Sequence, residues 1–206
     1  MNFISVYLFC FLVFIVWLRY EQRKSNKYEQ KVSDEFWARE EQANRTRKKD
    51  ISHLPLLHID ESEIPLTSVT TEEIEHNLKQ IRQIIKKPML DLSEYSNTDL
   101  KLAYGVANFN TLSEYDETYN LFLVSLTNLA RSYRREKLWE AAEKTYRLAL
   151  SYGSKKLCDY TELASVLLEL DAPEQVSELI QQVEQSDYPR RESLAQALRE
   201  TLSTYQ

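Results

Sequence analysis

The sequence predicts an all-α protein: an N-terminal transmembrane helix, a charged helical stalk, and a short stack of helical hairpins closed by a C-terminal capping helix. Three observations support this prediction. The first eighteen residues carry no charged side chain. Apolar residues then recur every three to four positions, which is the period of an amphipathic helix. The 206 residues include only two glycines and five prolines, which favours helices over a turn-rich β fold.

The composition also excludes some classes of function. Two glycines, Gly105 and Gly153, are too few for a phosphate-cradling loop, so a nucleotide-binding enzyme of the usual kinds is not expected. Residues 1–49 hold ten Lys/Arg and six Asp/Glu, a net charge of +4, whereas residues 50–206 hold sixteen and twenty-six, a net charge of −10. An acidic body repels phosphate backbones, so we expect no nucleic-acid partner.

The residues that carry metal or catalytic chemistry are few and scattered. Cys10 and Cys158 lie far apart, and His53 and His58 flank a proline in a non-helical segment, so neither pair has metal-ligand spacing. No Ser/His/Asp set is suggested, and Glu72 and its acidic neighbours fit the start of a helix. We therefore expect no cofactor, no metal and no enzymatic activity.

Residues 1–20 are predicted to form a transmembrane anchor. Eighteen uncharged residues make about 27 Å of helix, close to the ~30 Å of a bilayer core. Trp17 and Tyr20 lie at the end of the run, where aromatic rings favour the headgroup zone. The alternative, a cleaved signal peptide, needs a basic start and a small-residue cleavage site, and neither is present.

The charges that follow the anchor predict its orientation. Arg19, Arg23, Lys24, Lys27 and Lys31 come directly after the apolar run, and no Lys or Arg precedes it. By the positive-inside rule, the N-terminus lies outside and the C-terminal domain lies in the cytoplasm. We expect a single-pass protein of the cell membrane, of a bacterial type.

The stalk, residues 21–49, mixes both signs of charge and contains no glycine or proline, which is typical of an exposed helix. Phe36 and Trp37 mark a candidate docking point on it. Residues 50–70, with Pro55 and Pro65, are predicted to be an extended linker.

Residues 71–122 are predicted to form the N-terminal helices of the helical domain. Thr70 or Thr71 fits an N-cap, and an apolar stripe runs from Ile74 to Lys87, where Pro88 ends the helix. A short helix capped at 97–99 closes around Gly105, and the next begins near Ser113.

The stretch 123–190 contains two segments with the same residue pattern, offset by 34 residues. The first starts at Leu123 and the second at Leu157. Leu126, Leu129, Ala130 and Tyr133, followed by Ala142, Tyr146 and Ala149, correspond to a second set, namely Tyr160, Leu163, Ala164 and Leu167, then Val176, Ile180 and Val183. This pattern resembles the tetratricopeptide repeat, a pair of helices that spans about 34 residues. Four positions depart from that family: Leu126 for its tryptophan, Ala130 for its glycine, Ser154 for its proline and Val176 for its alanine. Residues 191–206 are expected to form the capping helix.

The resemblance implies a concave groove, lined by the first helix of each repeat, that binds a protein or peptide. The implied groove residues are Val124, Thr127, Asn128, Arg131, Arg134, Arg135, Cys158, Thr161, Ser165 and Leu168. The three arginines form a basic cluster that fits an acidic segment or a C-terminal carboxylate. The alternative is that they are surface arginines paired with Glu136 and Glu140.

Taken together, the sequence predicts a membrane-anchored scaffold that binds a protein or peptide partner at the cytoplasmic face. Two alternatives stay open at this point. In one, the chain is a structural subunit whose transmembrane helix makes the main contacts. In the other, it is a repeat protein on the outer face of the membrane, which requires the charge rule to fail.

Overall fold

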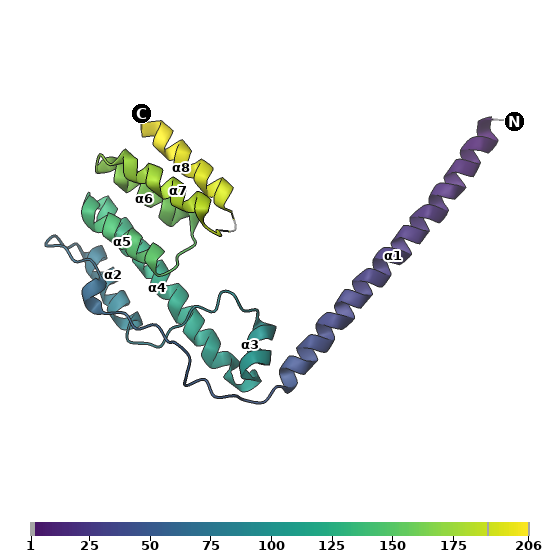
Figure 1. Ribbon diagram of the computed structural model, residues 1–206, viewed down its shortest axis with the longest axis horizontal. Helices are drawn as coiled ribbons and strands as arrows, with labels where there is room; N and C mark the ends of the chain where they lie inside the picture. Colours follow the sequence, from purple (N-terminus) through teal and green to yellow (C-terminus); the bar gives the residue numbers. More distant parts are fainter. Residues whose placement is uncertain (1–2, 189, 206) are drawn as a thin grey trace. The chain divides into compact units, whose positions relative to one another are not determined.

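The only regular secondary structure in the described part of the chain is helical. The computed structural model describes the backbone of residues 3–188 and 190–205, and the side chains of 11–188 and 190–204. Within these residues the chain forms eight α-helices and two short 3-10 helices, with no strand (Figure 1). The predicted all-α class is therefore confirmed. The chain divides into two units: Met1–His53 with Ser93–Thr111, here called the stalk unit, and Leu54–Leu92 with Leu112–Gln206, here called the hairpin unit.

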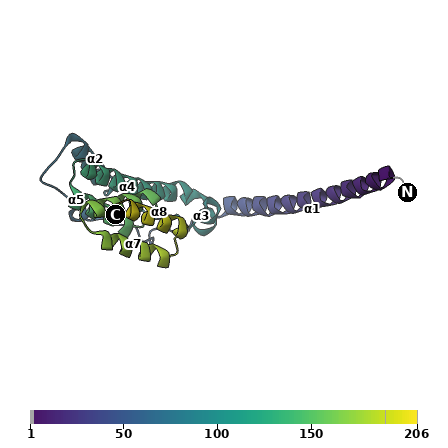
Figure 2. The same cartoon turned by 90° about the horizontal axis from the view of Figure 1, so that it is seen from above.

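The main element of the stalk unit is one continuous helix, α1, which spans Phe3–Arg45 (Figures 1 and 2). Its 43 residues correspond to about 65 Å of helix. The predicted stalk is thus helical up to Arg45, and residues 46–49 are not helical. The predicted anchor and stalk belong to the same helix.

No helix among the residues searched is both long enough and apolar enough to cross a membrane; the search covered the described residues. The side chains of residues 1–10, which make up half of the predicted anchor, lie outside the described residues.

The C-terminal end of α1 is held by α3 (Asn97–Tyr104) and the 3-10 helix η2 (Val106–Asn108). Glu40 accepts hydrogen bonds from Lys101 and Thr98, and the backbone N–H of Lys49 donates to Tyr104 O over 3.0 Å. Gly105 has φ +87°, and a Cβ there would overlap the backbone carbonyl of Arg47. Only glycine permits both this backbone conformation and this close approach.

The N-cap of α3 differs from the prediction by one residue. Ser96 precedes the helix, accepts a hydrogen bond from the backbone N–H of Asp99, and donates its own backbone N–H to the Asp99 side chain. This capping box satisfies two backbone donors at once, which is why Ser96 is the cap and Asn97 is already the first residue of the helix.

The hairpin unit begins with residues 54–70, here called the strap, which is not a free linker. Ile64 is buried in the core, and Tyr133 Oη donates to Pro65 O over 2.7 Å. Tyr152 Oη donates to Glu63 over 2.7 Å. These contacts, together with the 3-10 turn Glu61–Glu63, hold the strap against the helices. Apolar residues of the strap therefore supply part of the core.

Helix α2 (Glu72–Ile84) follows the strap, and Thr71 is its N-cap, one of the two threonines predicted. The helix ends three residues earlier than Lys87. Asn77 of α2 donates to Ser132 Oγ over 2.6 Å, which fixes α2 against α4. The polar contact is buried, so it adds specificity to the apolar packing around it.

Five helices complete the unit, and their bounds are Phe109–Arg135 (α4), Trp139–Ser151 (α5), Leu157–Glu169 (α6), Pro173–Gln185 (α7) and Arg191–Tyr205 (α8). Helix α4 starts four residues before Ser113, in the stalk unit. Helix α6 packs against α5 and α7, and α8 packs against both α6 and α7 (Figures 1 and 2). The predicted capping helix is thus present and covers the last hairpin.

The two hairpins repeat each other in their turns as well as in their helices, with the step that the sequence pattern predicts. Lys137 and Asp171 both adopt a left-handed conformation, with φ 57° and 56°. The next residue in each turn closes it with an equivalent hydrogen bond: Leu138 N to Tyr133 O over 2.9 Å, and Ala172 N to Leu167 O over 3.0 Å. The α4–α5 turn and the α6–α7 turn therefore have the same backbone geometry.

The core of the hairpins follows the predicted pattern of small and large residues. Ala130, Ala142, Ala149 and Ala164 are fully buried, which lets the paired helices approach closely, and Tyr133 and Tyr146 fill the space beside them. The repeat is less regular at its first position, because Leu123 is buried whereas Leu157 is exposed. That position starts α6 but lies inside the longer α4.

Candidate protein-binding face

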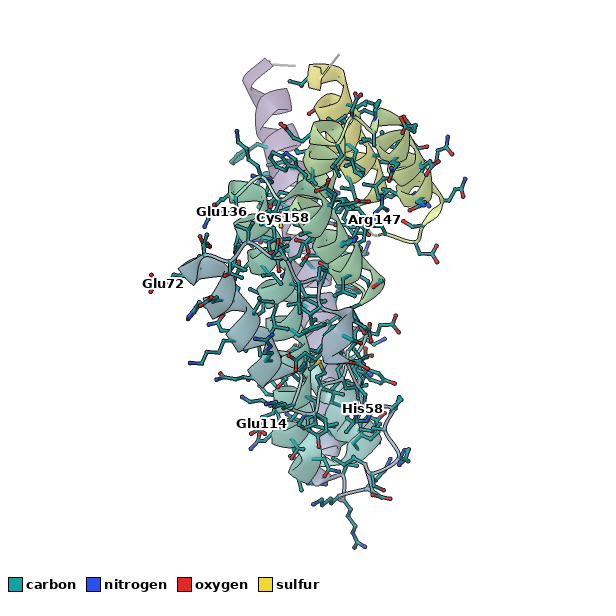
Figure 3. The ribbon with its side chains drawn as sticks, turned by 90° about the vertical axis from the view of Figure 1, so that its left-hand side faces the viewer. His58, Glu72, Glu114, Glu136, Arg147 and Cys158 are labelled. Carbon is teal, nitrogen blue, oxygen red and sulfur yellow. The ribbon has the colours of Figure 1, made fainter. Side chains whose placement is uncertain are left out.

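The residues of the predicted groove lie on α4 and α6 and are here called the α4/α6 face. Val124, Asn128 and Arg135 are exposed, and five more are partly exposed, namely Arg131, Arg134, Cys158, Thr161 and Ser165. Cys158 is labelled in Figure 3 together with Arg147 of α5. Eight of the ten predicted residues are therefore accessible on the two helices.

Two predicted groove residues are buried, so their assignment as groove-lining residues is wrong. Thr127 is 3% exposed, because its hydroxyl lies 3.0 Å from Leu123 O and 2.9 Å from Asp159 Oδ1. Leu168 is 5% exposed and belongs to the hydrophobic core. Because the surrounding helices enclose these two positions, neither side chain is accessible to another protein.

The basic cluster is held by an acid that sequence reasoning missed. Glu162, on α6, accepts from Arg131 Nε over 2.9 Å and from Arg131 Nη2 over 2.6 Å. Tyr146 Oη also donates to Glu162, and Arg134 Nη1 lies 3.8 Å from it. A planar guanidinium bound by two parallel N–H donors to a carboxylate is a strong and directional pair. Arg131 is therefore already occupied from within the chain.

Arg135 is also paired, with Glu73 at the start of α2. The partners that the sequence suggested for the arginines were Glu136 and Glu140, but the acids that bind them are Glu162 and Glu73. Both acids lie far from the arginines in sequence and close in space. Three positive charges on this face are thus offset by two negative charges.

The electrostatics of Glu162 follow from these bonds. Partial burial acts to raise its pKa, but the hydrogen bonds from Arg131 and Tyr146 and the charges of Arg131 and Arg134 outweigh burial, and the pKa lies below its usual value. Burial and the bond to Glu162 raise the pKa of Tyr146, so its phenol stays protonated and donates. At neutral pH Glu162 is ionised and the arginine fork is filled.

A second missed acid, Asp159, is fully buried at the start of α6. Its carboxylate accepts from Ser154 and lies 2.9 Å from the Thr127 hydroxyl, so it joins α4, the α5–α6 turn and α6. The residue at the equivalent position of the first hairpin, Ser125, is also buried. A recurring small polar residue among apolar ones was the signal available in the sequence.

Cys158 lies next to Asp159 on the α4/α6 face. Burial, together with the negative charge of Asp159, raises the pKa of the Cys158 thiol. A raised pKa keeps the sulfur in its thiol form, which is the poorer nucleophile and metal ligand. Among the described side chains, no group of three or more His, Cys, Asp or Glu is placed to hold a metal ion.

A cleft of about 370 Å³ lies between α5, α6 and α7, outside the predicted groove. Its lining is half apolar and half polar and consists of Arg147, Leu150, Ser151, Tyr160, Leu179, Gln182, Val183 and Ser186. Arg147 is the one charged side chain in this lining, and it already binds Glu143 and Gln175. This cleft therefore brings together no acid–base pair that could do chemistry.

Comparison of the chain with models of protein families, with curated proteins and with solved structures gave no match in any of the three. The relation to tetratricopeptide repeats is accordingly treated below as a proposal.

Proposed function

We propose that the chain is a non-enzymatic adaptor that is tethered to a membrane and binds a protein or peptide on the α4/α6 face of a tetratricopeptide-like stack. The observation that carries this proposal is the recurrence of one hairpin with a constant step along the chain, including the left-handed turn residues Lys137 and Asp171. Stacked hairpins of this kind expose an extended, rigid surface, and rigid helices with accessible polar side chains suit the binding of a chain segment.

The membrane tether is supported by the apolar start of α1. Residues 3–18 contain no charge, and within the described part Phe11, Val13, Phe14, Val16 and Trp17 are all exposed on different sides of the helix. Removing such a side chain from water is worth about 1.5–3 kcal/mol. A helix that is apolar on all sides requires an apolar environment on all sides, which a bilayer supplies. The cations that follow favour a cytoplasmic hairpin unit.

The chemistry of the partner is suggested by Arg134. Its side chain is 40% exposed and lies 3.8 Å from Glu162, a carboxylate that Arg131 and Tyr146 already bind. Most of the five N–H donors of Arg134 are thus open to a ligand. The face fits a segment with a single carboxylate, either a side chain or a chain end, better than a strongly acidic one. Exposed Val124 adds an apolar contact.

The test is a cross-linking pull-down that compares the native chain with Arg134→Glu. Arg147→Glu is the matched control, because Arg147 is 45% exposed and also lies next to one acid, but on α5. The expected result is that Arg134→Glu loses at least tenfold of the captured partner whereas Arg147→Glu keeps it. Arg131→Glu is not suitable, because that substitution also breaks the pair with Glu162.

Equal capture by both variants would overturn the α4/α6 face as the binding site. A second arm replaces residues 1–18 by an unrelated transmembrane sequence. An adaptor keeps its partner after this exchange, whereas a structural subunit that binds through its membrane helix loses it.

A further inference from the structure

Helix α1 carries an exposed apolar stripe well beyond the predicted anchor. Tyr28, Val32 and Phe36 follow one another at intervals of four residues and are 70%, 47% and 54% exposed. Since a helix turns roughly 100° per residue, these side chains lie on one face over about two turns. The Trp37 ring packs edge-on against Phe36, with centroids 5.4 Å apart. Apolar side chains grouped in this way are unlike scattered surface residues.

The stripe continues an interface that the chain already uses. The same face of α1 runs from Phe36 through Arg39 to Ala43, with steps of three and four residues, and this second part is covered by α3. Ala43 is buried there, and Arg39 forms an ion pair with Asp99. Helix α3 has eight residues, about 12 Å, so it covers only the C-terminal turns of the face.

The two carboxylates nearest the stripe lie on both of its sides. Glu29 and Glu35 lie about 60° to either side of it, while Arg23, Lys27 and Asp34 lie on the opposite side of the helix. Lys31 lies 3.7 Å from Glu35, but both side chains are largely exposed, and a pair of this kind is weak enough to leave the carboxylate open to a second cation. A molecule bound at the stripe would therefore contact apolar side chains that have a carboxylate on each side.

The flanking carboxylates favour an occupant that carries positive charge on both sides of its own apolar stripe.

We propose that residues 28–36 of α1 dock a helix of another protein, one that presents an apolar stripe flanked by Lys or Arg. The α3 contact shows the same chemistry within the chain: Leu100 is buried while Lys101 of α3 binds Glu40 of α1 over 3.2 Å. The docked helix packs against α1 on the N-terminal side of α3, and its Lys or Arg side chains form ion pairs with Glu29 and Glu35. This site lies on the stalk unit and is separate from the α4/α6 face.

The test places a photo-reactive phenylalanine analogue at Phe36 of the full chain in its native membranes, with the analogue at Lys27, on the opposite face, as the matched control. The expected result is a protein adduct whose yield at 36 exceeds that at 27 by at least fivefold. Mass spectrometry of the adduct should place the cross-link in a helical segment of net positive charge. Glu29→Lys/Glu35→Lys should lower the yield at least fivefold, and Lys→Glu in the captured segment should restore it.

The proposal is overturned by an adduct with the mass of two copies, by a phospholipid adduct, by a cross-link within the same chain, or by equal yields at the two positions. It is also overturned if charge reversal leaves the yield unchanged. The variant Arg134→Glu keeps the cross-link at Phe36 if the two surfaces act separately. Failure of the stalk site can thus be told apart from failure of the proposed adaptor face.

Discussion

At the scale of single residues, Glu162 organises the α4/α6 face. It accepts from Arg131 of the preceding hairpin and from Tyr146 of α5, so one carboxylate holds the first hairpin to the second. Without it, two arginines would repel each other beside a phenol that has no acceptor. In the proposed binding at this face, Glu162 would act indirectly, by fixing the position of the arginines.

Glu162→Gln should lower the free energy of unfolding at pH 7 by about 1–2 kcal/mol, a value reduced because the Arg131 side chain is 38% exposed. The pKa of Glu162 is lower in the folded chain than its usual value of 4.5. Its stabilisation is thus fully present above about pH 4.5 and is lost as the pH falls through the folded pKa. The measurement is urea unfolding at pH 7 and near pH 3. The difference in unfolding free energy between Glu162→Gln and the native chain should be smaller at the lower pH.

The matched control for this measurement is Glu143→Gln. Glu143 binds Arg147 four residues further along the same helix, and such exposed pairs contribute about 0.3–0.5 kcal/mol. If the two variants lost the same stability, the contact of Glu162 across the hairpins would have no special role.

The residue scale is also where sequence reasoning was least successful. The arginines were visible as a cluster, but their acids were not, since Glu162 is 31 residues from Arg131 and Glu73 is 62 residues from Arg135. Periodicity assigns a residue to a face of its own helix and says nothing about which neighbouring helix meets that face. Thr127 was misassigned for the same reason, because its burial comes from Asp159 on the next hairpin.

At the scale of elements, the turns at Lys137 and Asp171 are the clearest sign of a repeat. Both residues adopt φ near +57° without being glycine. Left-handed conformations cost an L-residue roughly 1–2 kcal/mol, and neither side chain has a branched β-carbon that would add to this. Because two non-glycine residues at equivalent positions both adopt this unfavourable conformation, the two turns require the same backbone geometry.

Lys137→Gly and Asp171→Gly should therefore each stabilise the chain, by about 0.5–1 kcal/mol after the entropic cost of glycine is subtracted. Urea midpoints of the two variants give the measurement. Lys144→Gly, at an exposed position inside α5, is the control and should destabilise by about 1 kcal/mol. Opposite signs at 137 and 171 would mean that the two turns are not equivalent.

The elements themselves were largely predictable, because helix periodicity and capping are local. Helix α6 begins at Leu157 and α8 at Arg191, where the second segment and the last helix were expected to start, and Thr71 caps α2 as one of two proposed residues. The strap was not predictable in the same way. Its Ile64 is buried through contacts with distant helices, and a proline-bounded segment with acidic residues has the local composition of a linker.

At the scale of the whole molecule, the proposed tether leads to a direct test. Val13→Arg/Val16→Arg places two cations in the apolar run, each costing about 2.5–3.5 kcal/mol near the centre of a bilayer. The chain should then appear in the supernatant when membranes are washed with alkaline carbonate, whereas the native chain stays in the pellet. Val32→Arg, on the same helix beyond the run, should also stay in the pellet.

If the doubly charged variant stays in the pellet, insertion of residues 3–18 does not hold the chain to the membrane. The arrangement of charge along the chain is what made this proposal possible from sequence, since an uncharged run followed by cations is a pattern of composition. The docking stripe on α1 needed the structure, because only the position of α3 shows which face of the helix is already in use.

The close approach of Gly105 to Arg47 has a consequence for biosynthesis. The two residues are separated in sequence by residues 54–92, which belong to the hairpin unit. The C-terminal end of α1 therefore cannot make this contact until that segment has been synthesised. At about 5–20 residues per second, a ribosome needs on the order of 3–12 seconds to reach Gly105 after Arg47. Until α3 and Gly105 have been made, the C-terminal end of α1 lacks the contacts that hold it in the folded chain.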